Sequence, residues 1–574
     1  MRLSKAFIKN YRNFLDEEIN INEKSLLIGP NDVGKSNLLK AIRIVLDKTY
    51  SSLQLEPNEN DFNVFGGDDE ITITLEFTDI TEYIDDYILA KFNCIKDGTM
   101  YITYKGYKNC DEPYKFYIGH SRDLELMKEV PRQSITNTIN CVYLNSTREL
   151  KTFLKKAKIK MIENYKNKRE TQEIENDSIL IEKINNNVET LNQDIEKISY
   201  INKSTDYIKQ ELDYTSNHNN NLDIKLSSYN DFDDITSNVD LVTIIDGKQV
   251  ELGGDGRSNQ IYMSMWIKEM NELYDENNQF VIFIIEEPES HLFFPTQSIT
   301  IRRIIKTLKN QLIVSSHSPK IVLEFQPNSI IRLYFDKKMK TKIANHGCSK
   351  EIEDAILKFG YRNNLINGEM FFADSVVLVE GPSELMLYKE LANQINKPLE
   401  KYNISVISVD GIGFESYVNL LETLEIPYSV RTDNDIQEQR DGKYNYTGLN
   451  RLIKIYNKFV NNDSIDELAP KNEKDLTKNE KKYFDKCIEK LKEKNLFLSD
   501  KDLENDLINT NVGTKITELL KKSPDKTIKY LQAYKAIRMF ELLSQKIDIT
   551  ELKNTSIYFP LNCLYQLQED DANE

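Results

Sequence analysis

The sequence predicts a mixed α/β protein with two α/β domains, the first of which is interrupted by a helical insertion. Short apolar runs typical of buried strands occur in residues 1–150, return in residues 236–340, and begin again at residue 371. Between the first two regions, residues 151–235 carry a repeating apolar pattern typical of long helices. At 574 residues the chain is also too long for one hydrophobic core.

Eight apolar runs supply the expected strands. Those of the first domain are residues 26–28, 71–77, 141–144, 281–285 and 312–314, and those of the second domain begin residues 375–381, 404–411 and 428–435. Residues 341–370 are polar with helical character and are expected to link the two domains. The second domain is expected to span residues 371–574.

The helical insertion has the a/d spacing of a coiled coil. Its apolar positions, separated by steps of 3 and 4, are Ile181, Ile184, Val188, Leu191, Ile195 and Ile198. About three heptads are too few for a long rod, so the segment is expected to pack on a second subunit or on itself. Packing in a dimer is the preferred interpretation, and an intrachain helical hairpin is the alternative.

Composition limits the classes of partner. Lys and Arg total 75 against 92 Asp and Glu, and the net charge of −17 argues against a protein that coats nucleic acid by bulk electrostatics. Residues 151–170 are a local basic candidate, as a phosphate-binding surface or as a solvated helix face. No long apolar segment or signal core is present, so we expect a cytoplasmic protein without membrane contact. The scattered cysteines argue against a zinc site or disulfide framework.

The sharpest motif is GPNDVGKS at residues 29–36, which matches the P-loop pattern GxxxxGK[ST] between an expected strand and an amphipathic helix. Backbone amides of such a loop, with the helix N-terminus behind it, cradle phosphates. Lys35 is expected to reach the β- and γ-phosphates of ATP, and the Ser36 hydroxyl to ligate Mg²⁺. The loop residues assigned to nucleotide binding are Gly29, Asn31, Gly34, Lys35, Ser36 and Asn37.

Acids at the end of another expected strand supply the partner that a P-loop needs. The run FVIFIIEEPES ends its apolar part at Glu286 and Glu287. Two consecutive carboxylates are costly on a buried strand unless they serve a metal or a water. We therefore assign Glu286 to the magnesium side and Glu287 to polarising the attacking water. His317, at the end of the strand in LIVSSHSP, is placed to sense the γ-phosphate; the alternative is an ordinary core histidine.

Together these motifs resemble the ABC-type ATPases of the SMC and RecF kind. Residues 8–14, IKNYRNF, resemble their first-strand motif, which assigns Arg12 to the nucleotide site. Residues 252–257 occupy the place of their signature loop, which in that family contacts the γ-phosphate of a partner subunit. The signature lacks its serine, Glu286 stands where Asp is usual, and two phenylalanines replace a frequent His and Pro. These departures predict that ATP acts as a conformational gate more than as a fuel.

A second group of acids lies in the second domain. Glu380 follows the apolar run SVVLV and precedes a helix that carries Glu384, and Asp433 and Asp435 end another strand about fifty residues later. Strand-end carboxylates from neighbouring strands can converge on one point, and Mg²⁺ or Mn²⁺ takes several oxygen ligands. Two such ions clamp the attacking and leaving oxygens of a phosphodiester. Glu384 is assigned as a metal ligand or its neighbour, with a helix-surface glutamate as the alternative.

Glu380 with its following glycine and the pair Asp433 and Asp435 resemble a TOPRIM domain. An ATPase with a helical insertion followed by a TOPRIM domain resembles the OLD-family nucleases over nearly the whole chain. Within that family the resemblance is greatest to the nuclease subunits of Gabija anti-phage defence systems. It implies DNA as substrate, a homo-oligomer, either dimer or tetramer, and a helicase-like partner protein.

The resemblance also extends to downstream residues. By it, Glu504 or Asp506 completes the metal cluster, and Lys535 stabilises charge on the scissile phosphate; for each the alternative is a surface residue. Residues 440–505, rich in charged residues and Asn, are expected to form an insertion that is mobile or faces DNA. The complete set of expected metal ligands is Glu380, Glu384, Asp433, Asp435, Glu504, Asp506 and Ser36.

These assignments predict an ATP-gated, Mg²⁺-dependent DNA endonuclease of an anti-phage defence system. The expected catalytic residues are Glu380, Asp433, Asp435, Lys535 and Glu287. The alternative is a DNA-binding ATPase switch of the SMC or RecF kind without nuclease activity. The intact group of acids argues against it, because a site that had lost its activity would be free to lose carboxylates that repel one another. A primase or topoisomerase would need a zinc module, which the cysteine spacing excludes, or a nucleophilic-tyrosine domain, to which nothing else points.

Overall fold

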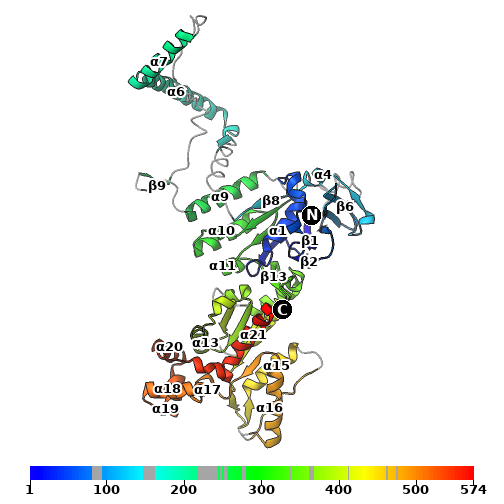
Figure 1. Cartoon of the computed structure of the whole chain (residues 1–574), viewed down its shortest axis with the longest axis vertical. Coiled ribbons are helices and arrows are strands. Elements are labelled where there is room, and N and C mark those ends of the chain that lie inside the picture. The colour runs from blue at the N-terminus through cyan, green and yellow to red at the C-terminus, as the bar shows by residue number, and fades with distance from the viewer. Residues whose placement is uncertain are drawn as a thin grey trace. The chain divides into compact units, whose positions relative to one another are not determined.

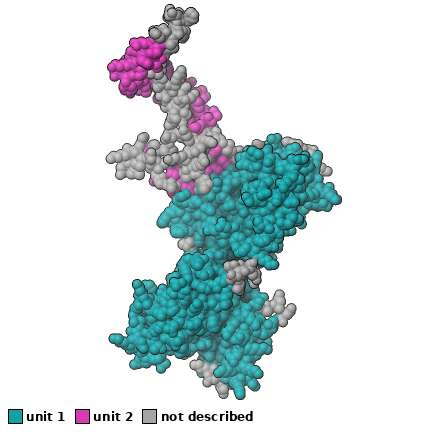
Figure 2. All heavy atoms as spheres, viewed as in Figure 1, with its two compact units in different colours: residues 1–146, 274–574 teal, residues 147–273 magenta. Residues whose placement is uncertain are grey.

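The chain divides into two compact units, residues 1–146 with 274–574, and residues 147–273 (Figure 2). The computed structural model describes residues 1–80, 94–146, 159, 162–163, 165–215, 243–245, 248–250, 255–273, 280–336, 338–360, 367–410, 413–459, 463–472 and 476–573. The expected domain boundaries at residues 150, 235, 340 and 370 stay predictions. Among the described helices, none combines the length and apolar character needed to cross a membrane.

The first unit begins with an antiparallel sheet of six strands in the order β2-β1-β4-β5-β6-β7. Its strands are β1 (Arg2–Tyr11), β2 (Phe14–Asn20), β4 (Glu70–Thr78), β5 (Met100–Tyr107), β6 (Tyr114–Gly119) and β7 (Met127–Glu129). Inward positions alternate with outward ones, as in β4, where Ile71 and Ile73 are buried and Thr72 between them is partly exposed. One face of this sheet therefore packs on the core.

A second sheet of six strands has the order β14-β13-β3-β12-β11-β8. Its strands are β3 (Lys24–Ile28), β8 (Ile139–Leu144), β11 (Phe280–Glu286), β12 (Gln311–Ser315), β13 (Ile330–Phe335) and β14 (Thr341–Ile343). All neighbours pair in parallel except β13 with β14. The central strands are mainly apolar, as in β11, because helices cover both faces of a parallel sheet. Helices of this region are α1 (Lys35–Leu46), α2 (Ser52–Leu55), α4 (Arg132–Thr136), α10 (Phe294–Thr307), α11 (Pro319–Val322) and α12 (Lys350–Phe359).

The strand order brings three loops together. β3, β12 and β11 are consecutive neighbours and run parallel, so their carboxyl ends lie at one edge of the sheet. The loop before α1, the segment at His317 and the acids at Glu286 follow these three strands. Ligands of open α/β sheets bind at that edge.

The second unit contains the long helices α6 (Thr171–Glu196) and α7 (Ser199–Thr215), together with β9 (Thr243–Ile245), β10 (Lys248–Val250) and α9 (Asp255–Leu273) (Figure 1). No side chain of α6 is buried, and Leu191 of the apolar stripe is 52% exposed. The other stripe positions are partly exposed, except Ile198, which is exposed, so the stripe is at most partly covered by the rest of the chain. Packing of α6 on a second subunit stays a prediction. The candidate basic residues 151–170 lie mostly outside the described residues.

The later part of the first unit contains a parallel sheet in the order β16-β15-β17-β20. Its strands are β15 (Ser375–Val379), β16 (Ile404–Ser408), β17 (Tyr428–Thr432) and β20 (Leu496–Leu498). Its helices are α13 (Pro382–Gln394), α14 (Phe414–Thr423), α15 (Thr447–Phe459), α16 (Lys478–Lys492), α17 (Leu503–Ile508), α18 (Asn511–Leu520), α19 (Pro524–Ala533), α20 (Lys535–Ser544) and α21 (Phe559–Asn573) (Figure 1). The small hairpin β18 (Ile436–Glu438) and β19 (Tyr444–Tyr446) precedes α15.

The structure differs from the expectation for residues 440–505. α15 buries Leu449, Leu452 and Ile453, so it is anchored by apolar side chains. β20 also falls inside this range and is an edge strand of the domain's own sheet. The high content of Lys, Glu and Asn concealed these anchors because α15 exposes its polar side chains on one face only.

Candidate active site

The loop between β3 and α1 has the tight geometry of a phosphate-binding loop. Gly29 has φ of 143°, and a Cβ there would lie 2.3 Å from the carbonyl oxygen of Leu333 on the neighbouring strand β13. Gly34 precedes α1 as its N-cap, while Asn31 and Ser36 are exposed. The loop thus presents polar groups at a helix N-terminus, where anions bind.

Lys35 turns back onto this loop. Its Nζ donates to the carbonyl oxygens of Gly29 at 2.9 Å and Pro30 at 2.5 Å, and the residue is only 7% exposed. Burial lowers the pKa of Lys35 to about 8, although the charges of Glu287 and Asp32 oppose this shift. The ammonium is therefore held in a place where an anion would stabilise its charge.

The acids after β11 face the same region. Glu286 is 7% exposed and accepts a hydrogen bond of 2.6 Å from the Tyr143 hydroxyl. Glu287 has a left-handed backbone with φ of 43°. Non-glycine residues rarely adopt this conformation, and those that do are concentrated at functional sites. Its Oε1 lies 3.7 Å from Nε2 of His317. The structure therefore brings the ends of β11 and β12 together, as expected.

Glu289 was missed by the reasoning from sequence. Its Oε1 accepts hydrogen bonds of 2.7 Å from the Ser316 hydroxyl and from the backbone amide of His317. Burial raises the pKa of Glu289. This side chain fixes the loop that carries His317, whose own pKa is lowered by burial and then by the charge of Lys35. Its position within EEPES, four residues past the strand's apolar part, was the available signal.

Arg12 and Asn37 are joined directly. Arg12 donates through Nη1 to Oδ1 of Asn37 at 2.8 Å and through Nε to Asp61 at 2.9 Å. Asn37 in turn donates to Oδ1 of Asn13 at 2.7 Å. These bonds link the first-strand motif to the first turn of α1. Of the expected signature loop, residues 252–254 lie outside the described residues, and α9 begins at Asp255.

The second group of acids converges as the parallel register requires. Glu380 follows β15 and Asp433 follows the neighbouring strand β17. Oε1 of Glu380 accepts from the backbone amide of Asp433 at 3.0 Å and from the Thr432 hydroxyl. Burial, together with the charges of Glu380 and Glu384, raises the pKa of Asp433 to about 7. The acids are thus close enough to repel one another.

Lys535 lies beside this group at the first residue of α20. Its Nζ is 3.5 Å from Oδ2 of Asp433 and 3.5 Å from Oε2 of Glu504. Burial disfavours the Lys535 charge, but the carboxylates of Glu504, Asp433 and Glu384 outweigh it and raise the pKa of Lys535. Glu504 is 1% exposed, and burial raises its pKa. The structure therefore joins Lys535 and Glu504 to the acids at the strand ends.

Asp506 and Glu384 have different surroundings. Asp506 forms a buried ion pair of 2.7 Å with Arg431 and accepts from the backbone amides of Asp500 and Lys501. Both of its oxygens thus have protein donors, which favours Glu504 over Asp506 as the further ligand. Glu384, in the first turn of α13, is 5% exposed, and burial raises its pKa. It is a buried residue and not the helix-surface glutamate of the alternative.

Arg451 of α15 was also missed from the sequence. Its Nη1 donates to Oε1 of Glu380 at 2.5 Å and its Nη2 donates to Oδ2 of Asp435 at 3.1 Å. The guanidinium thereby bridges two of the expected metal ligands. One arginine in a lysine-rich helix carries no signal of such a role in the sequence.

The donor set suits a divalent cation, although its present arrangement does not yet form a coordination shell. All candidate ligands are carboxylate oxygens, which Mg²⁺ and Mn²⁺ prefer, and the buried Oε2 of Glu504 has the Lys535 ammonium at 3.5 Å. Among the described residues, no three Asp, Glu, His or Cys side chains are grouped closely enough to hold an ion as they stand. Arg451 and Lys535 are the cations that contact these acids instead.

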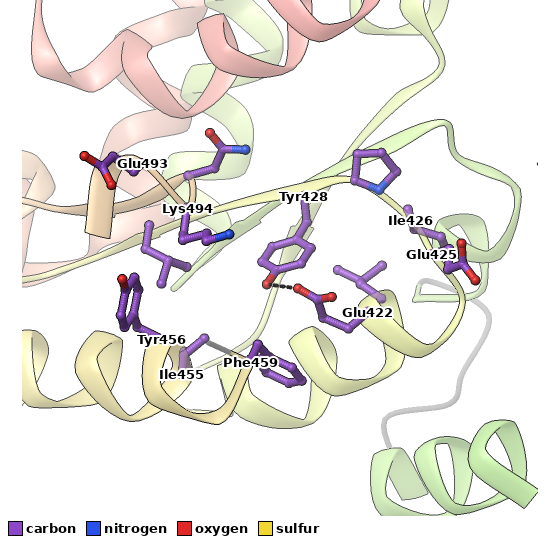
Figure 3. A pocket seen from close by; sticks show the side chains of 13 residues that line it. Glu422, Glu425, Ile426, Tyr428, Ile455, Tyr456, Phe459, Glu493 and Lys494 are labelled. Atoms are coloured by element: carbon purple, nitrogen blue, oxygen red, sulfur yellow. Dashed lines mark hydrogen bonds between the residues drawn. The ribbon is translucent and has the colours of Figure 1, made fainter. Parts of the chain in front are cut away.

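A cavity at the opposite edge of the same sheet is separate from these acids. It has a volume of about 530 Å³ and is lined by residues at the start of β17 and β20, including Tyr428 and Leu496 (Figure 3). The Tyr428 hydroxyl donates to Glu422 at 2.7 Å across it. Because Asp433 follows the other end of β17, this cavity does not belong to the candidate metal site.

A family model described as an AAA ATPase domain matches residues 1–322, more than half of the chain. The chain belongs to the AAA ATPase domain family. A second model, the TOPRIM domain of proteins like the overcoming lysogenization defect protein, matches residues 371–435. These matches and the observed sheets confirm the expected order of ATPase domain and TOPRIM domain and the resemblance to the OLD family.

Two curated relatives are nucleases by name. Endonuclease GajA of Bacillus cereus strain VD045 is 26% identical over 581 residues, covering 95% of this chain and 95% of that protein. An OLD nuclease of Thermus scotoductus is 27% identical over 161 residues, covering 27% of this chain and 30% of that protein. The family matches and these relatives support the expected enzyme class, a nuclease that carries an ATPase domain.

Two solved structures have detectable likeness to parts of this chain. An SMC head domain from Thermotoga maritima matches 60% of this chain and 98% of that chain at 13% identity, with a TM-score of 0.30. The C-terminal region of the OLD protein of Xanthomonas campestris pv. campestris matches 36% of this chain and 96% of that chain at 23% identity, with a TM-score of 0.24.

Proposed function

We propose that this chain is a Mg²⁺- or Mn²⁺-dependent DNA endonuclease whose cleavage is regulated by ATP binding at its ATPase domain. The observation that carries the proposal is the convergence of Glu380 and Asp433, at the carboxyl ends of parallel strands, with Glu504 of α17 and Lys535. Such a group of buried acids is costly to keep unless it binds a cation. A lysine beside it suits a phosphodiester substrate.

In this proposal the acids hold metal and Lys535 holds substrate. Glu380, Asp433, Asp435 and Glu504 would be ligands, with Glu384 supporting them from the first turn of α13. Bound divalent ions would neutralise charge on the phosphodiester and activate the attacking water. The Lys535 ammonium would donate to a non-bridging oxygen of the scissile phosphate and stabilise the charge that grows there.

Nucleotide binding in this proposal occurs at the P-loop. Lys35 would leave the carbonyls of Gly29 and Pro30 and pair with the β- and γ-phosphates, while Ser36 and Glu286 would share Mg²⁺. Glu287 and His317 lie 3.7 Å apart and would face the γ-phosphate. The unusual acids and signature residues favour ATP as a gate over rapid turnover.

The biological setting is also part of the proposal. The relative named Endonuclease GajA covers 95% of this chain, and the resemblance to Gabija nuclease subunits favours a role in anti-phage defence. We propose that the enzyme acts as a homo-oligomer in the cytoplasm beside a helicase-like partner. The coiled-coil spacing of α6, whose apolar stripe is not buried within the chain, supports packing on a second copy.

The direct test uses purified full-length protein, supercoiled plasmid and Mg²⁺. Asp433→Ala should slow nicking or cleavage by more than about a hundredfold, because it removes a metal ligand. The matched control is Asp441→Ala, in the exposed turn between β18 and β19, which should cleave like the wild type. Equal cleavage by Asp433→Ala and wild type would discard the site. ATP-dependent retention of DNA without scission in the wild type would instead favour the ATPase-switch alternative.

A second variant separates the two sites. Lys35→Ala should abolish the response of cleavage to ATP while divalent-ion binding in nucleotide-free protein stays unchanged. Loss of that ion binding in Lys35→Ala would contradict the assignment of separate nucleotide and nuclease sites.

A further inference from the structure

The side chain of Arg451 lies between two acids of the candidate metal site, Glu380 and Asp435. Its guanidinium contacts Glu380 at 2.5 Å, Asp435 at 3.1 Å and the hydroxyl of Thr432, and the side chain is only 10% exposed. These contacts come from two nitrogens of one planar fork, whereas lysine would have to make them from a single ammonium nitrogen. The two strand-end acids are therefore joined by a cation that belongs to the protein.

The start of α15 is fixed against the loop that carries the acids. The backbone amide of Thr447 donates to the carbonyl oxygen of Asp435 at 2.8 Å. At Gly448 an added Cβ would lie 2.1 Å from the carbonyl oxygen of Asp433, so only glycine permits this approach. Arg451 follows one helical turn after Thr447 and thus reaches back into the site from a rigid support.

The donors around Glu380 leave little room for an ion. Its Oε1 accepts from the Thr432 hydroxyl, the amide of Asp433 and the guanidinium of Arg451. A carboxylate oxygen has about two lone-pair sites, so this oxygen is already saturated. Removal of the guanidinium would leave only the Thr432 hydroxyl and the Asp433 amide on this oxygen, and it would free Oδ2 of Asp435 for an ion.

Electrostatics point in the same direction. Like charges disfavour one another at short distance, and an opposite charge placed between them offsets that repulsion. With Arg451 between them, Glu380 and Asp435 are neutralised without metal, whereas a divalent ion would bring the same carboxylates a larger charge. Guanidinium and metal cannot occupy the space between these oxygens together.

We propose that Arg451 is a built-in counter-cation that competes with the catalytic metal for Glu380 and Asp435 and must withdraw before the metal binds. This inference rests on the proposed metal-dependent function. Arg451 is a positioning residue that sets the affinity of the site for its ion. The enzyme therefore binds metal only when a high ion concentration or bound substrate compensates for the lost arginine contacts.

The test measures Mn²⁺ binding to nucleotide-free, full-length protein by the electron paramagnetic resonance signal of the free ion. Arg451→Met should bind Mn²⁺ at least about tenfold more tightly than the wild type, because the competing charge is gone and the aliphatic stem is kept. Arg451→Lys keeps the positive charge but loses the planar, two-nitrogen guanidinium, so its Mn²⁺ affinity should lie between those of the wild type and Arg451→Met. If Arg451→Met does not fold, the Arg451→Lys variant should still bind Mn²⁺ more tightly than the wild type.

Two controls make the result specific. The first control is Lys454→Met, three residues after Arg451 in the same helix. The Lys454 side chain is 66% exposed, and its Nζ lies 3.7 Å from Glu467. The Mn²⁺ affinity of this variant should match the wild type within about twofold. Asp433→Ala should lose the bound ion. The melting temperature supplies a second readout. In EDTA, Arg451→Met should have a lower melting temperature than the wild type. Added Mn²⁺ should raise the melting temperature of Arg451→Met by more than it raises that of the wild type.

Equal or weaker Mn²⁺ binding by the folded variants at position 451, with Asp433→Ala losing the ion, would overturn this inference and leave the proposed metal site intact. Full Mn²⁺ binding by Asp433→Ala would overturn the metal site and this inference with it. Plasmid cleavage by the wild type is scored separately, so failure of the nuclease proposal is distinguishable from both results.

Discussion

The charge of Lys35 links nucleotide affinity to pH. Burial lowers the pKa of Lys35 to about 8 in the free protein, and bound phosphates would favour the protonated form. Below pH 8 the ammonium is already charged, so binding needs no proton. Above pH 8 binding must take up a proton, and the affinity falls as the pH rises.

ATP affinity should therefore drop by about tenfold between pH 7 and pH 9. Titration of a fluorescent ATP analogue across this range measures the effect. Lys35→Arg, whose guanidinium stays charged, should give a flatter profile. A wild-type affinity that is constant from pH 7 to pH 9 would contradict the role given to Lys35.

Two neighbouring acids of α17 should respond differently to neutral substitution. Glu504→Gln should abolish most cleavage and keep the fold, because the amide preserves shape but weakens a metal ligand. Asp506→Asn should destabilise the domain by about 3–5 kcal/mol, because Arg431, whose side chain is 3% exposed, loses its buried partner. Chemical denaturation and plasmid cleavage of both variants give the comparison. Equal stability losses in the two variants would show that these roles are misassigned.

At the scale of elements, the closest backbone approach of α15 to the acidic loop described above is at Gly448. Gly448→Ala would place a methyl group against the carbonyl oxygen of Asp433, so α15 or the loop must shift. We expect a loss of Mn²⁺ binding and of cleavage with the ATPase domain unaffected. Gly67→Ala, where an added Cβ would meet nothing within 4 Å, is the matched control and should behave like the wild type. Normal Mn²⁺ binding by Gly448→Ala would refute the link.

Strands with strong apolar runs were predictable from sequence, and shorter ones were not. β3, β11, β12, β15 and β17 all coincide with expected runs, and the acids or loops that follow them fall where the parallel register puts them. β20 has only three residues within a charged region, so its signal was too weak. The bridge from Arg451 depends on the path of α15 between two strands, and no local pattern encodes such a tertiary contact.

At the scale of the whole molecule, Arg332 connects the ATPase domain with the TOPRIM domain. It pairs in register with Ile28, which directly precedes the P-loop, and it is 1% exposed. Its guanidinium donates to the carbonyl oxygens of Leu424 at 3.0 Å and Ala373 at 3.1 Å. Ala373 lies two residues before β15, the strand that ends at Glu380. We propose that a shift of the P-loop strand reaches the acids along this route.

Arg332→Met should remove the influence of ATP on cleavage, because the carbonyl oxygens lose their donor while the buried stem remains. ATP and Mn²⁺ affinities should each stay within about twofold of the wild type, since neither site loses a ligand. Arg302→Met, which removes an exposed ion pair with Glu324, is the control and should keep the ATP response. An unchanged ATP response in Arg332→Met would argue against this route of coupling.

The central claim is that acids at the ends of separate strands of the TOPRIM sheet together bind a divalent ion. Crystals grown with Mn²⁺ and measured at the manganese absorption edge locate such an ion directly. The account predicts an anomalous peak bounded by Glu380, Asp433 and Asp435, with the Arg451 guanidinium moved away from it. A map with no peak among these carboxylates at saturating Mn²⁺, and Arg451 still bridging them, would contradict the account.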